Sequence, residues 1–275
     1  MEMLNFIFDA ASIKPGDFTG FTFFIGSVSM LAATVWFLMQ HGQVDKKFKD
    51  SMLVAALITG IAAVHYFYMR EQWTGNYEDL KAAQDALANA AADADTVALE
   101  AAVAAEFKLS SPVVLRYIDW ILTVPLMVVE FALLTGVGMR KLFWASTVML
   151  VAGYFGESGV TGMLDAQTWG AISGVAYFWM AYEVGCLSIS GGPSGSVGNA
   201  LASASGKIPS AGRMLQWFVL VGWAIYPIGY MAGTTGWYEG MFAFLDEGSM
   251  NLIYNIGDAV NKIGFGMAVW YAAKS

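Results

Sequence analysis

The stretch NLIYNIGDAVNKIGFGMAVWYAA, residues 251–273, decides how this chain folds. An α-helix rises about 1.5 Å per residue, so this stretch is long enough to cross the roughly 30 Å hydrocarbon core of a bilayer. Lys262 lies near its middle, and Asp258 lies four residues earlier on the same helical face. A lysine at that depth costs about 3 kcal/mol or more unless it is paired or chemically altered. The pair therefore indicates a lysine retained for covalent chemistry inside a membrane.

The composition of the whole chain agrees with a membrane protein. Its 275 residues are 57% hydrophobic and 13% charged, with a mean hydropathy of +0.54, whereas soluble domains carry about 25% charged residues. We therefore expect membrane lipid to surround it. The net charge of −8 argues against nucleic acid as a partner. Cys186 is the single cysteine in the sequence, so we expect neither an intramolecular disulfide nor a Cys/His metal cluster.

Apolar stretches of about 20 residues, the length of a membrane-spanning helix, recur along the chain. We expect one all-α domain over residues 1–275, formed by a bundle of seven transmembrane helices. No segment between the apolar stretches is large enough to fold alone. The stretches are 20–40, 51–71, 110–133, 140–160, 166–188, 212–234 and 248–273.

Lysine and arginine residues gather in the connections on one side of this predicted bundle. They occur in the connections 41–50 and 134–141, at Lys207 and Arg213, and near the C-terminus at Lys274. Short connections rich in these residues face the cytoplasm. We therefore expect a multi-pass protein of the cell inner (plasma) membrane, with its N-terminus outside and its C-terminus in the cytoplasm.

Two connections differ from short loops. Residues 72–109 are rich in alanine and acidic residues, and we expect an elongated extracellular loop that holds a short helix or a helical hairpin. Two roles remain open for it: a solvent-exposed segment that binds nothing, or a contact with a partner or another protomer. Residues 187–212 are rich in Gly and Ser, which predicts a flexible loop on the cytoplasmic side.

The third apolar stretch contains RYIDWILTVPLMVVEF, residues 116–131. At 3.6 residues per turn, Thr123, Glu130 and Arg116 fall about 40°, 20° and 60° from Asp119 around the helix. The four polar groups therefore share one stripe, along which Asp119 and Glu130 are about 16 Å apart. This helix enters from outside, so Arg116 is outermost and Glu130 lies toward the cytoplasm. Two carboxylates half a membrane apart on one stripe can serve as successive proton sites.

A purely structural interpretation of these charges is weak. One membrane carboxylate can serve as a hydrogen-bonding group, but several buried charges are too costly to retain without a use. The last helix runs in the same direction as the third, so Asp258 lies one turn outward of Lys262. Asp258 and Asp119 can then face one cation as a pair, and Arg116 balances the extra negative charge.

The sixth apolar stretch contains WAIYPIGY, residues 223–230. Trp223, Tyr226 and Tyr230 recur at helical spacing and form one aromatic face, while Pro227 should bend the helix. Together with Trp120, and with Tyr177 or Trp179 of the fifth stretch, these rings could line a flat slot for an elongated conjugated ligand. An aromatic stripe alone more often reflects core packing, but here it coincides with a buried lysine and its counter-charges.

His65, in GIAAVHYFYMR (residues 60–70), is the intramembrane histidine of the second stretch. The residues leave two interpretations open. A membrane histidine usually forms a hydrogen bond between helices, but one near Asp119 could instead tune how readily that acid is protonated.

At these motifs the chain resembles the microbial (type 1) rhodopsins, and within them the proteorhodopsins. The resemblance covers all seven predicted helices and is carried by residues 60–70, 116–131, 223–230 and 251–266. It implies a bundle with all-trans retinal in the core, bound to Lys262 as a protonated Schiff base. It also implies that Asp119 is the proton acceptor and primary counterion, Asp258 the second counterion and Glu130 the proton donor.

The same resemblance gives roles to the remaining polar and aromatic positions. Thr123 completes the Asp–Thr–Glu triplet of outward proton pumps, and His65 matches a histidine that bonds the acceptor. The positions that match the retinal pocket are Trp120, Met127, Tyr177, Trp223, Tyr226, Pro227 and Tyr230. A nonpolar residue at Met127 resembles the green-absorbing branch.

Gly170 has two interpretations. It is either a packing glycine between helices or, by resemblance to the xanthorhodopsin branch, a window for a carotenoid antenna. The resemblance also implies a homo-oligomer, a pentamer or hexamer.

The function that the resemblance implies is a light-driven outward proton pump, which is an ion transporter and not an enzyme. The alternative is a sensory rhodopsin, a photoreceptor with a slow photocycle. A sensor needs a transducer, and no obligate transducer is evident in the sequence. A carboxylate donor at Glu130 favours fast turnover, and Asp119 together with Glu130 argues against a pump for sodium or chloride.

Overall fold

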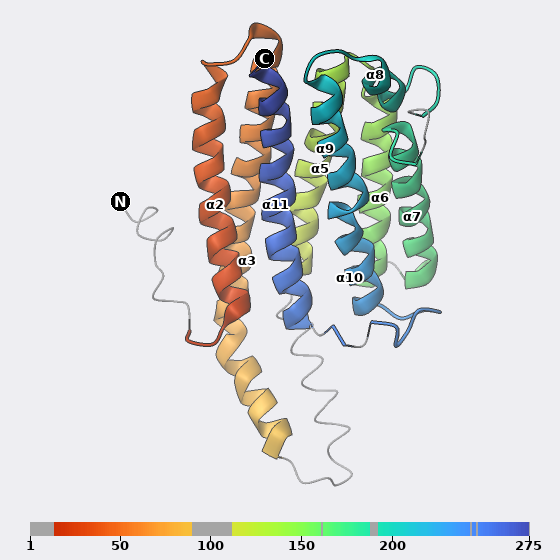
Figure 1. Ribbon diagram of the computed structural model, residues 1–275. Coiled ribbons are helices and arrows are strands. Elements are labelled where there is room, and N and C mark those ends of the chain that lie inside the picture. Colours follow the sequence, from red (N-terminus) through yellow and green to blue (C-terminus); the bar gives the residue numbers. More distant parts are fainter. Residues whose placement is uncertain are drawn as a thin grey trace.

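The structure is a computed structural model that describes residues 14–89, 112–160, 162–187, 192–242, 244–245 and 247–274. In these residues all of the regular elements are helical (Figure 1). They are α2 (Phe18–His41), η2 (Lys46–Phe48), α3 (Lys49–Asn89), α5 (Val113–Thr135), α6 (Arg140–Ser158), α7 (Ala166–Glu183), α8 (Val197–Ser203), α9 (Ile208–Leu220), η3 (Gly222–Ala224), α10 (Ile225–Gly233) and α11 (Glu247–Ala273).

The long helices stand side by side and close into a ring (Figure 1). In chain order α2 packs on α3, α3 on α5, α5 on α6, and α6 on α7; α7 contacts α9, and α11 packs on both α9 and α2. Each of the seven predicted spans corresponds to one of these helices, with the sixth divided into α9, η3 and α10. The prediction of an all-α seven-helix bundle is therefore confirmed.

The outer surface of the bundle is apolar, as expected for helices that face lipid. Large hydrophobic side chains that are at least half exposed occur on α2, α3, α6 and α7, among them Leu38, Leu57, Val64, Trp144, Val175 and Phe178. Four segments of the described chain are long and apolar enough to cross a membrane: Phe18–His41, Lys46–Gly75, Val113–Thr135 and Ile208–Gly233. α11 is less apolar because buried polar side chains line its inner face.

The two ends of the bundle differ in charge. One end, called the basic end below, contains the turn 42–48, the start of α6, the helix α8 and the chain terminus after α11 (Figure 1). Its basic residues are Lys46, Lys47, Lys49, Arg140, Lys141, Lys207, Arg213 and Lys274. The opposite end contains the starts of α2, α5 and α11 and the far part of α3.

The second helix extends well beyond its predicted end. α3 continues without interruption from Lys49 to Asn89, so residues 72–89 are part of the same helix and project from the opposite end of the bundle (Figure 1). Residues 76–89 contain neither Pro nor Gly, and more than half of them are Ala, Leu or another residue that favours helix. The rest of the predicted elongated loop, residues 90–109, lies outside the described residues.

The predicted flexible loop at 187–212 is also partly structured. It contains α8, whose first turn is capped by Ser196 Oγ, which accepts a hydrogen bond from Asn199 N. Val197 and Leu201 of α8 are buried against the bundle, and α9 already begins at Ile208. The prediction of a flexible loop was wrong there, because a helix of seven residues with a Ser cap and two buried apolar residues gives little periodic signal.

The sixth span is interrupted where Pro227 predicts a bend. The α-helix stops at Leu220, and the 3₁₀ segment η3 (Gly222–Ala224) lies one turn before Pro227. Proline cannot donate the backbone hydrogen bond to the carbonyl of residue 223 and its ring crowds that carbonyl, so the turn before it is displaced. The bend lies at the depth of Trp223 and Tyr226, which are the predicted slot residues of this helix.

Candidate functional site

Lys262 lies in the middle of α11 with only 2% of its surface exposed. Its Nζ donates to Asp119 Oδ2 of α5 at 2.8 Å and lies 3.1 Å from Asp258 Oδ2 of its own helix. Both carboxylates are completely buried. The structure thus brings the amine and the two acids into one ion cluster, although Lys262 and Asp119 are 143 residues apart in the sequence.

Arg116 completes the charge balance of this cluster. Its guanidinium is 1% exposed, and Nη1 lies 4.0 Å from Asp258 Oδ2. The guanidinium also donates to Tyr66 Oη at 3.2 Å and to the side-chain oxygens of Asn251 and Asn255 at 2.8 and 3.0 Å. Two buried cations therefore face two buried carboxylates, which is the condition under which buried charges are tolerated.

The two carboxylates have different surroundings. Asp258 accepts hydrogen bonds from Tyr66 Oη at 2.7 Å, Tyr226 Oη at 2.5 Å and Trp120 Nε1 at 3.0 Å. Asp119 accepts one from Lys262 on Oδ2, while its Oδ1 has no hydrogen-bond partner among the described residues. Each hydrogen bond to a carboxylate stabilises its ionised form. Asp119 is therefore the acid of the pair that is better placed to take up a proton.

His65 on α3 lies at the edge of this cluster. Its Nδ1 is 3.7 Å from Asp119 Oδ1, which is too long for a hydrogen bond, and 2.9 Å from the carbonyl of Ile61. The ring therefore bonds its own helix and not a neighbouring one, while its Nδ1 stays near the acceptor carboxylate. Of the two open interpretations, the geometry favours the one in which His65 acts on Asp119.

Thr123 and Glu130 lie further along α5 toward the basic end. Thr123 Oγ1 donates to the backbone carbonyl of Asp119, so it holds the turn that carries the acceptor. Glu130 is fully buried, and neither of its oxygens makes a hydrogen bond with the described residues. Its polar neighbour is Ser51 of α3. A carboxyl group held in such apolar surroundings is best kept as the neutral acid, which is the form that can donate a proton.

The aromatic side chains predicted to line the slot gather between α5, α11 and the bent sixth span. Trp120 packs edge-on against Tyr226 with ring centroids 4.8 Å apart, and Trp223 stacks on Phe265 of α11 at 6.0 Å. Met127 and Tyr177 are also buried, and Tyr177 Oη donates to the carbonyl of Val219. Trp179, the alternative to Tyr177, is 51% exposed and points away from the slot.

Two predicted pocket residues lie elsewhere. Pro227 is exposed on the outer side of α10, so it acts on the site through the bend and does not form a wall. Tyr230 is buried, but its hydroxyl donates to the carbonyl of Ala166 and its ring fills the space above Gly156 and Gly170. A Cβ at Gly170 would lie 2.7 Å from the Tyr230 ring, so close packing by itself accounts for this glycine.

Several site residues were not found from the sequence. Asn251, Asn255, Asp258 and Lys262 recur at spacings of four, three and four, and this polar stripe along α11 could have identified the two asparagines. Tyr66 follows His65 directly, but nothing local indicates that it reaches Asp258. Asn261, which donates to the carbonyl of Gly222 and to Tyr226 Oη, depends on the bend in the neighbouring span.

The site fits a chromophore that binds through an amine. A retinal bound to Lys262 needs a buried primary amine, a counter-charge for the nitrogen and apolar, aromatic surroundings, and the described side chains supply all three. Asp119 Oδ1, which has no hydrogen-bond partner among the described residues, belongs to the carboxylate that the amine contacts. No group of three or more His, Cys, Asp or Glu side chains able to hold a metal ion occurs in the described part of the chain.

Comparison with known proteins gives consistent matches over nearly the whole chain. The family described as bacteriorhodopsin-like protein matches residues 17–275. The chain is 39% identical to the blue-light absorbing proteorhodopsin of the gamma-proteobacterium Hot 75m4, over 94% of this chain and 86% of that protein. It is 35% identical to the green-light absorbing proteorhodopsin of the gamma-proteobacterium EBAC31A08, over 98% and 92%. Among solved structures, the blue light-absorbing proteorhodopsin from Med12 matches with 34% identity and a TM-score of 0.66, over 94% of this chain and 98% of that one.

Proposed function

This chain belongs to the bacteriorhodopsin-like family, and from that membership and its site we propose that it is a light-driven outward proton pump with all-trans retinal as its chromophore. The observation that carries the proposal is the order of ionisable groups along the bundle. The Lys262 amine contacts two buried carboxylates on one side, and Glu130 is buried on α5 further toward the basic end.

The direction of transport follows from the orientation that we propose. The basic end faces the cytoplasm, because short connections rich in Lys and Arg remain on that side. This places the C-terminus in the cytoplasm and the N-terminus outside, in the inner (plasma) membrane. Asp119 then lies on the outer side of the path and Glu130 on the inner side, so a proton that passes from Glu130 to Asp119 moves outward.

Each residue has a defined part in this path. Lys262 would hold retinal as a protonated Schiff base, and the retinal would supply light absorption and an isomerisation. Asp119, whose Oδ1 has no hydrogen-bond partner among the described residues, would accept the proton of the Lys262 nitrogen, while Asp258 stays ionised under its three hydrogen bonds and the nearby Arg116. Glu130 would return a proton to that nitrogen from the cytoplasmic side. Transfer between positioned groups of this kind typically contributes about 10²–10⁴-fold to a rate.

The return of a proton to Glu130 requires water from the basic end. We propose that the bend at η3 lets α9 move and that α8, whose Leu201 packs against Gly212 of α9, moves with it. This opens a path to the otherwise dry carboxyl group of Glu130.

Cells that make the protein with retinal test the proposal directly. Illumination should acidify the medium, a protonophore should abolish the signal, and Lys262→Ala should show none. Absence of light-driven acidification in the unchanged protein, or its persistence in Lys262→Ala, would contradict the pump. The sensory alternative is tested by flash photolysis, since a cycle of seconds indicates a sensor and tens of milliseconds a pump.

Two further parts of the proposal rest on the resemblance. We propose that the protein assembles as a pentamer or hexamer, which native mass spectrometry in detergent or nanodiscs can test. A carotenoid antenna at Gly170 is tested by adding carotenoid to the retinal-loaded protein and recording an excitation spectrum. If the antenna is present, energy transfer from carotenoid to retinal should occur and should be lost in Gly170→Trp. If Gly170 only makes room for the Tyr230 ring, no energy transfer should occur.

A further inference from the structure

A further acid, the half-buried Glu157, lies at the opposite end of the bundle, outward of Arg116. Tyr117 of α5 is 5% exposed, and its hydroxyl donates to Glu157 Oε2 of α6 at 2.8 Å. Gly153, one turn before Glu157, leaves room for this contact, because a Cβ there would lie 2.9 Å from the Tyr117 hydroxyl. The accepting carboxylate of Glu157 is thus held at a set position between two helices. None of the proton transfers described above uses it.

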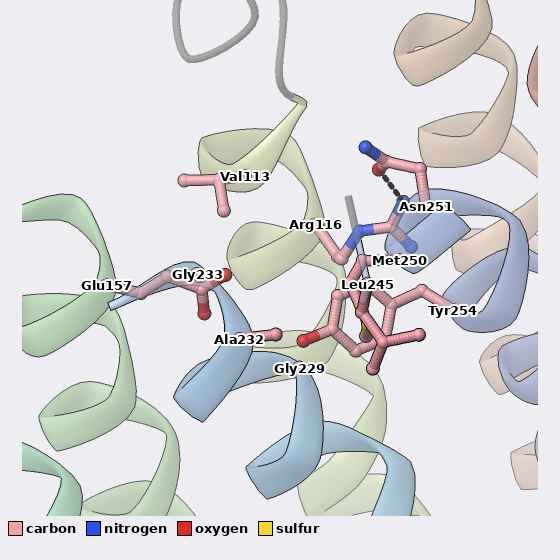
Figure 2. A pocket seen from close by; sticks show the side chains of 10 residues that line it. All are labelled: Val113, Arg116, Glu157, Gly229, Ala232, Gly233, Leu245, Met250, Asn251 and Tyr254. Atoms are coloured by element: carbon pink, nitrogen blue, oxygen red, sulfur yellow. Dashed lines mark hydrogen bonds between the residues drawn. The ribbon is translucent and has the colours of Figure 1, made fainter. Parts of the chain in front are cut away.

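Glu157 lines two cavities at once. The first has a volume of about 50 Å³ and is enclosed by α5, α6, α10 and α11, with Arg116, Asn251 and Tyr254 on one side and Glu157 on another (Figure 2). The second has a volume of about 240 Å³ and is lined by Glu157 together with the last turn of α6, the residues before α7 and the end of α10. Gly233 is the one other residue that lines both cavities.

These cavities are large enough for water and have polar walls. A buried water needs about 10–15 Å³ of accessible space and two to four polar partners. The inner cavity meets both conditions, since a guanidinium, an amide and a carboxylate line it. It begins at Arg116, whose Nη1 is 4.0 Å from Asp258, and it ends at Glu157. The outer cavity continues from Glu157 to the exposed residues Gly159, Gly162 and Leu164.

We propose that Glu157 is the proton-release carboxylate of this pump: it takes up the proton that leaves Asp119 and passes it to the outside medium. The proton leaves the Asp119 carboxyl group, crosses the inner cavity past Arg116, and binds the Glu157 carboxylate. It then leaves Glu157 through the outer cavity, after which both acids are ionised again. This inference rests on the proposed function and adds to it the exit half of the path.

The alternative is that Glu157 only ties α5 to α6 through Tyr117. That role predicts a less stable bundle on substitution but leaves proton release unchanged. The two roles are separated by measuring release itself, with a pH-sensitive dye in the medium, alongside the visible spectrum and the thermal loss of the retinal band. The retinal-loaded full chain in lipid nanodiscs is the sample.

In Glu157→Gln we expect an unchanged visible spectrum and an unchanged proton transfer to Asp119. The appearance of the proton in the medium should be delayed by roughly tenfold or more, since a positioned acid or base contributes about 10²–10⁴-fold and water can replace part of it. Glu157→Asp keeps the carboxylate and should restore part of the rate. Tyr117→Phe removes the hydrogen bond but keeps the ring, and we expect a smaller delay.

Asp165→Asn is the matched control. Asp165 is an exposed acid at the same end of the bundle that lines neither cavity and caps α7 by accepting from Thr168 N at 2.7 Å. Hydrogen bonds from Thr168 hold the pKa of Asp165 below its usual range. Asparagine caps a helix equally well, so this variant should release protons at the unchanged rate.

Three results would overturn the proposal. They are wild-type release kinetics in Glu157→Gln, a lower thermal midpoint in that variant without any delay, or an equal delay in Asp165→Asn. If the unchanged protein pumps and Glu157→Gln releases protons normally, only the release role fails. If the unchanged protein does not acidify the medium in light, the proposed function itself fails.

Discussion

Replacement of Gly222 by alanine should disturb the contact that joins the bent sixth span to the ion cluster. Gly222 opens η3, and its carbonyl accepts from Asn261 Nδ2 at 3.0 Å. Asn261 also donates to Tyr226 Oη at 3.3 Å, and Tyr226 donates to Asp258 at 2.5 Å. A change at Gly222 is therefore transmitted through three hydrogen bonds to Asp258, the second counterion.

The magnitude follows from the space at Gly222. A Cβ there would lie 2.1 Å from Asn261 Oδ1 and 3.1 Å from its Cγ, so the asparagine must move. Overpacking of this kind costs about 1–3 kcal/mol, and a lost buried hydrogen bond costs about 1 kcal/mol more. We expect Gly222→Ala to lower the free energy of unfolding by about 2–4 kcal/mol in total. The displaced Tyr226 should also shift the visible absorption band.

The assay is the thermal loss of the visible band in the retinal-loaded protein, compared with a matched glycine. Gly174, in the middle of α7, has nothing within 4 Å of an added Cβ. Gly174→Ala should therefore be neutral or stabilising, since alanine favours a helix over glycine by about 1 kcal/mol. The double variant Gly222→Ala/Asn261→Ala removes the clash, so its two effects should not add. Equal stability of Gly222→Ala and Gly174→Ala, or simple additivity in the double variant, would refute this reasoning.

Three further outcomes follow from the site. Asp119→Asn should abolish the proton transfer from the Lys262 nitrogen, whereas Asp258→Asn should retain a transfer but alter the visible band; flash photolysis distinguishes them, and transfer in Asp119→Asn would contradict the assigned acceptor. Glu130→Gln should slow the return of the proton to the nitrogen by about 10²-fold or more, seen as a prolonged deprotonated state, and an unchanged decay would exclude the donor role. Met127→Gln places an amide at a buried slot position that is 1% exposed and should shift absorption to the blue, which an absorption spectrum records; an unmoved band would count against this position as the colour-tuning residue.

Much of the fold could be predicted because the bilayer imposes lengths on the chain. Each of the seven apolar stretches became a helix, with ends near the predicted ones wherever a Gly or a charged residue stops the apolar run. The prediction placed helix within residues 72–109 but missed that residues 72–89 continue α3, and it missed α8. In those segments the outcome depends on whether the helix can continue into water or find a surface to cover, and local composition does not determine either.

The ionisable residues of the site could likewise be predicted, because a charged side chain inside a membrane has a high free-energy cost. Lys262, Asp119, Asp258 and Glu130 are conspicuous in apolar stretches, since charges in a membrane need partners. The other residues that complete the site and the exit path were not conspicuous. Asn261, Tyr66 and Glu157 have ordinary positions in the sequence, and their roles depend on contacts with helices far away along the chain.

The sequence by itself determined that this protein is a seven-helix membrane bundle with a lysine and two carboxylates at matching depth, because helical rise and period convert residue spacing directly into depth and facing direction. Only the tertiary structure decided how the two carboxylates differ. Asp258 receives three hydrogen bonds from α3, α5 and α10, while one oxygen of Asp119 has no hydrogen-bond partner in the described part of the chain. The same is true of the exit side, where Glu157 meets the path from Arg116 only because α6 packs against α5. Depth is a property of one helix, but the number of donors around an acid is set by the packing of several.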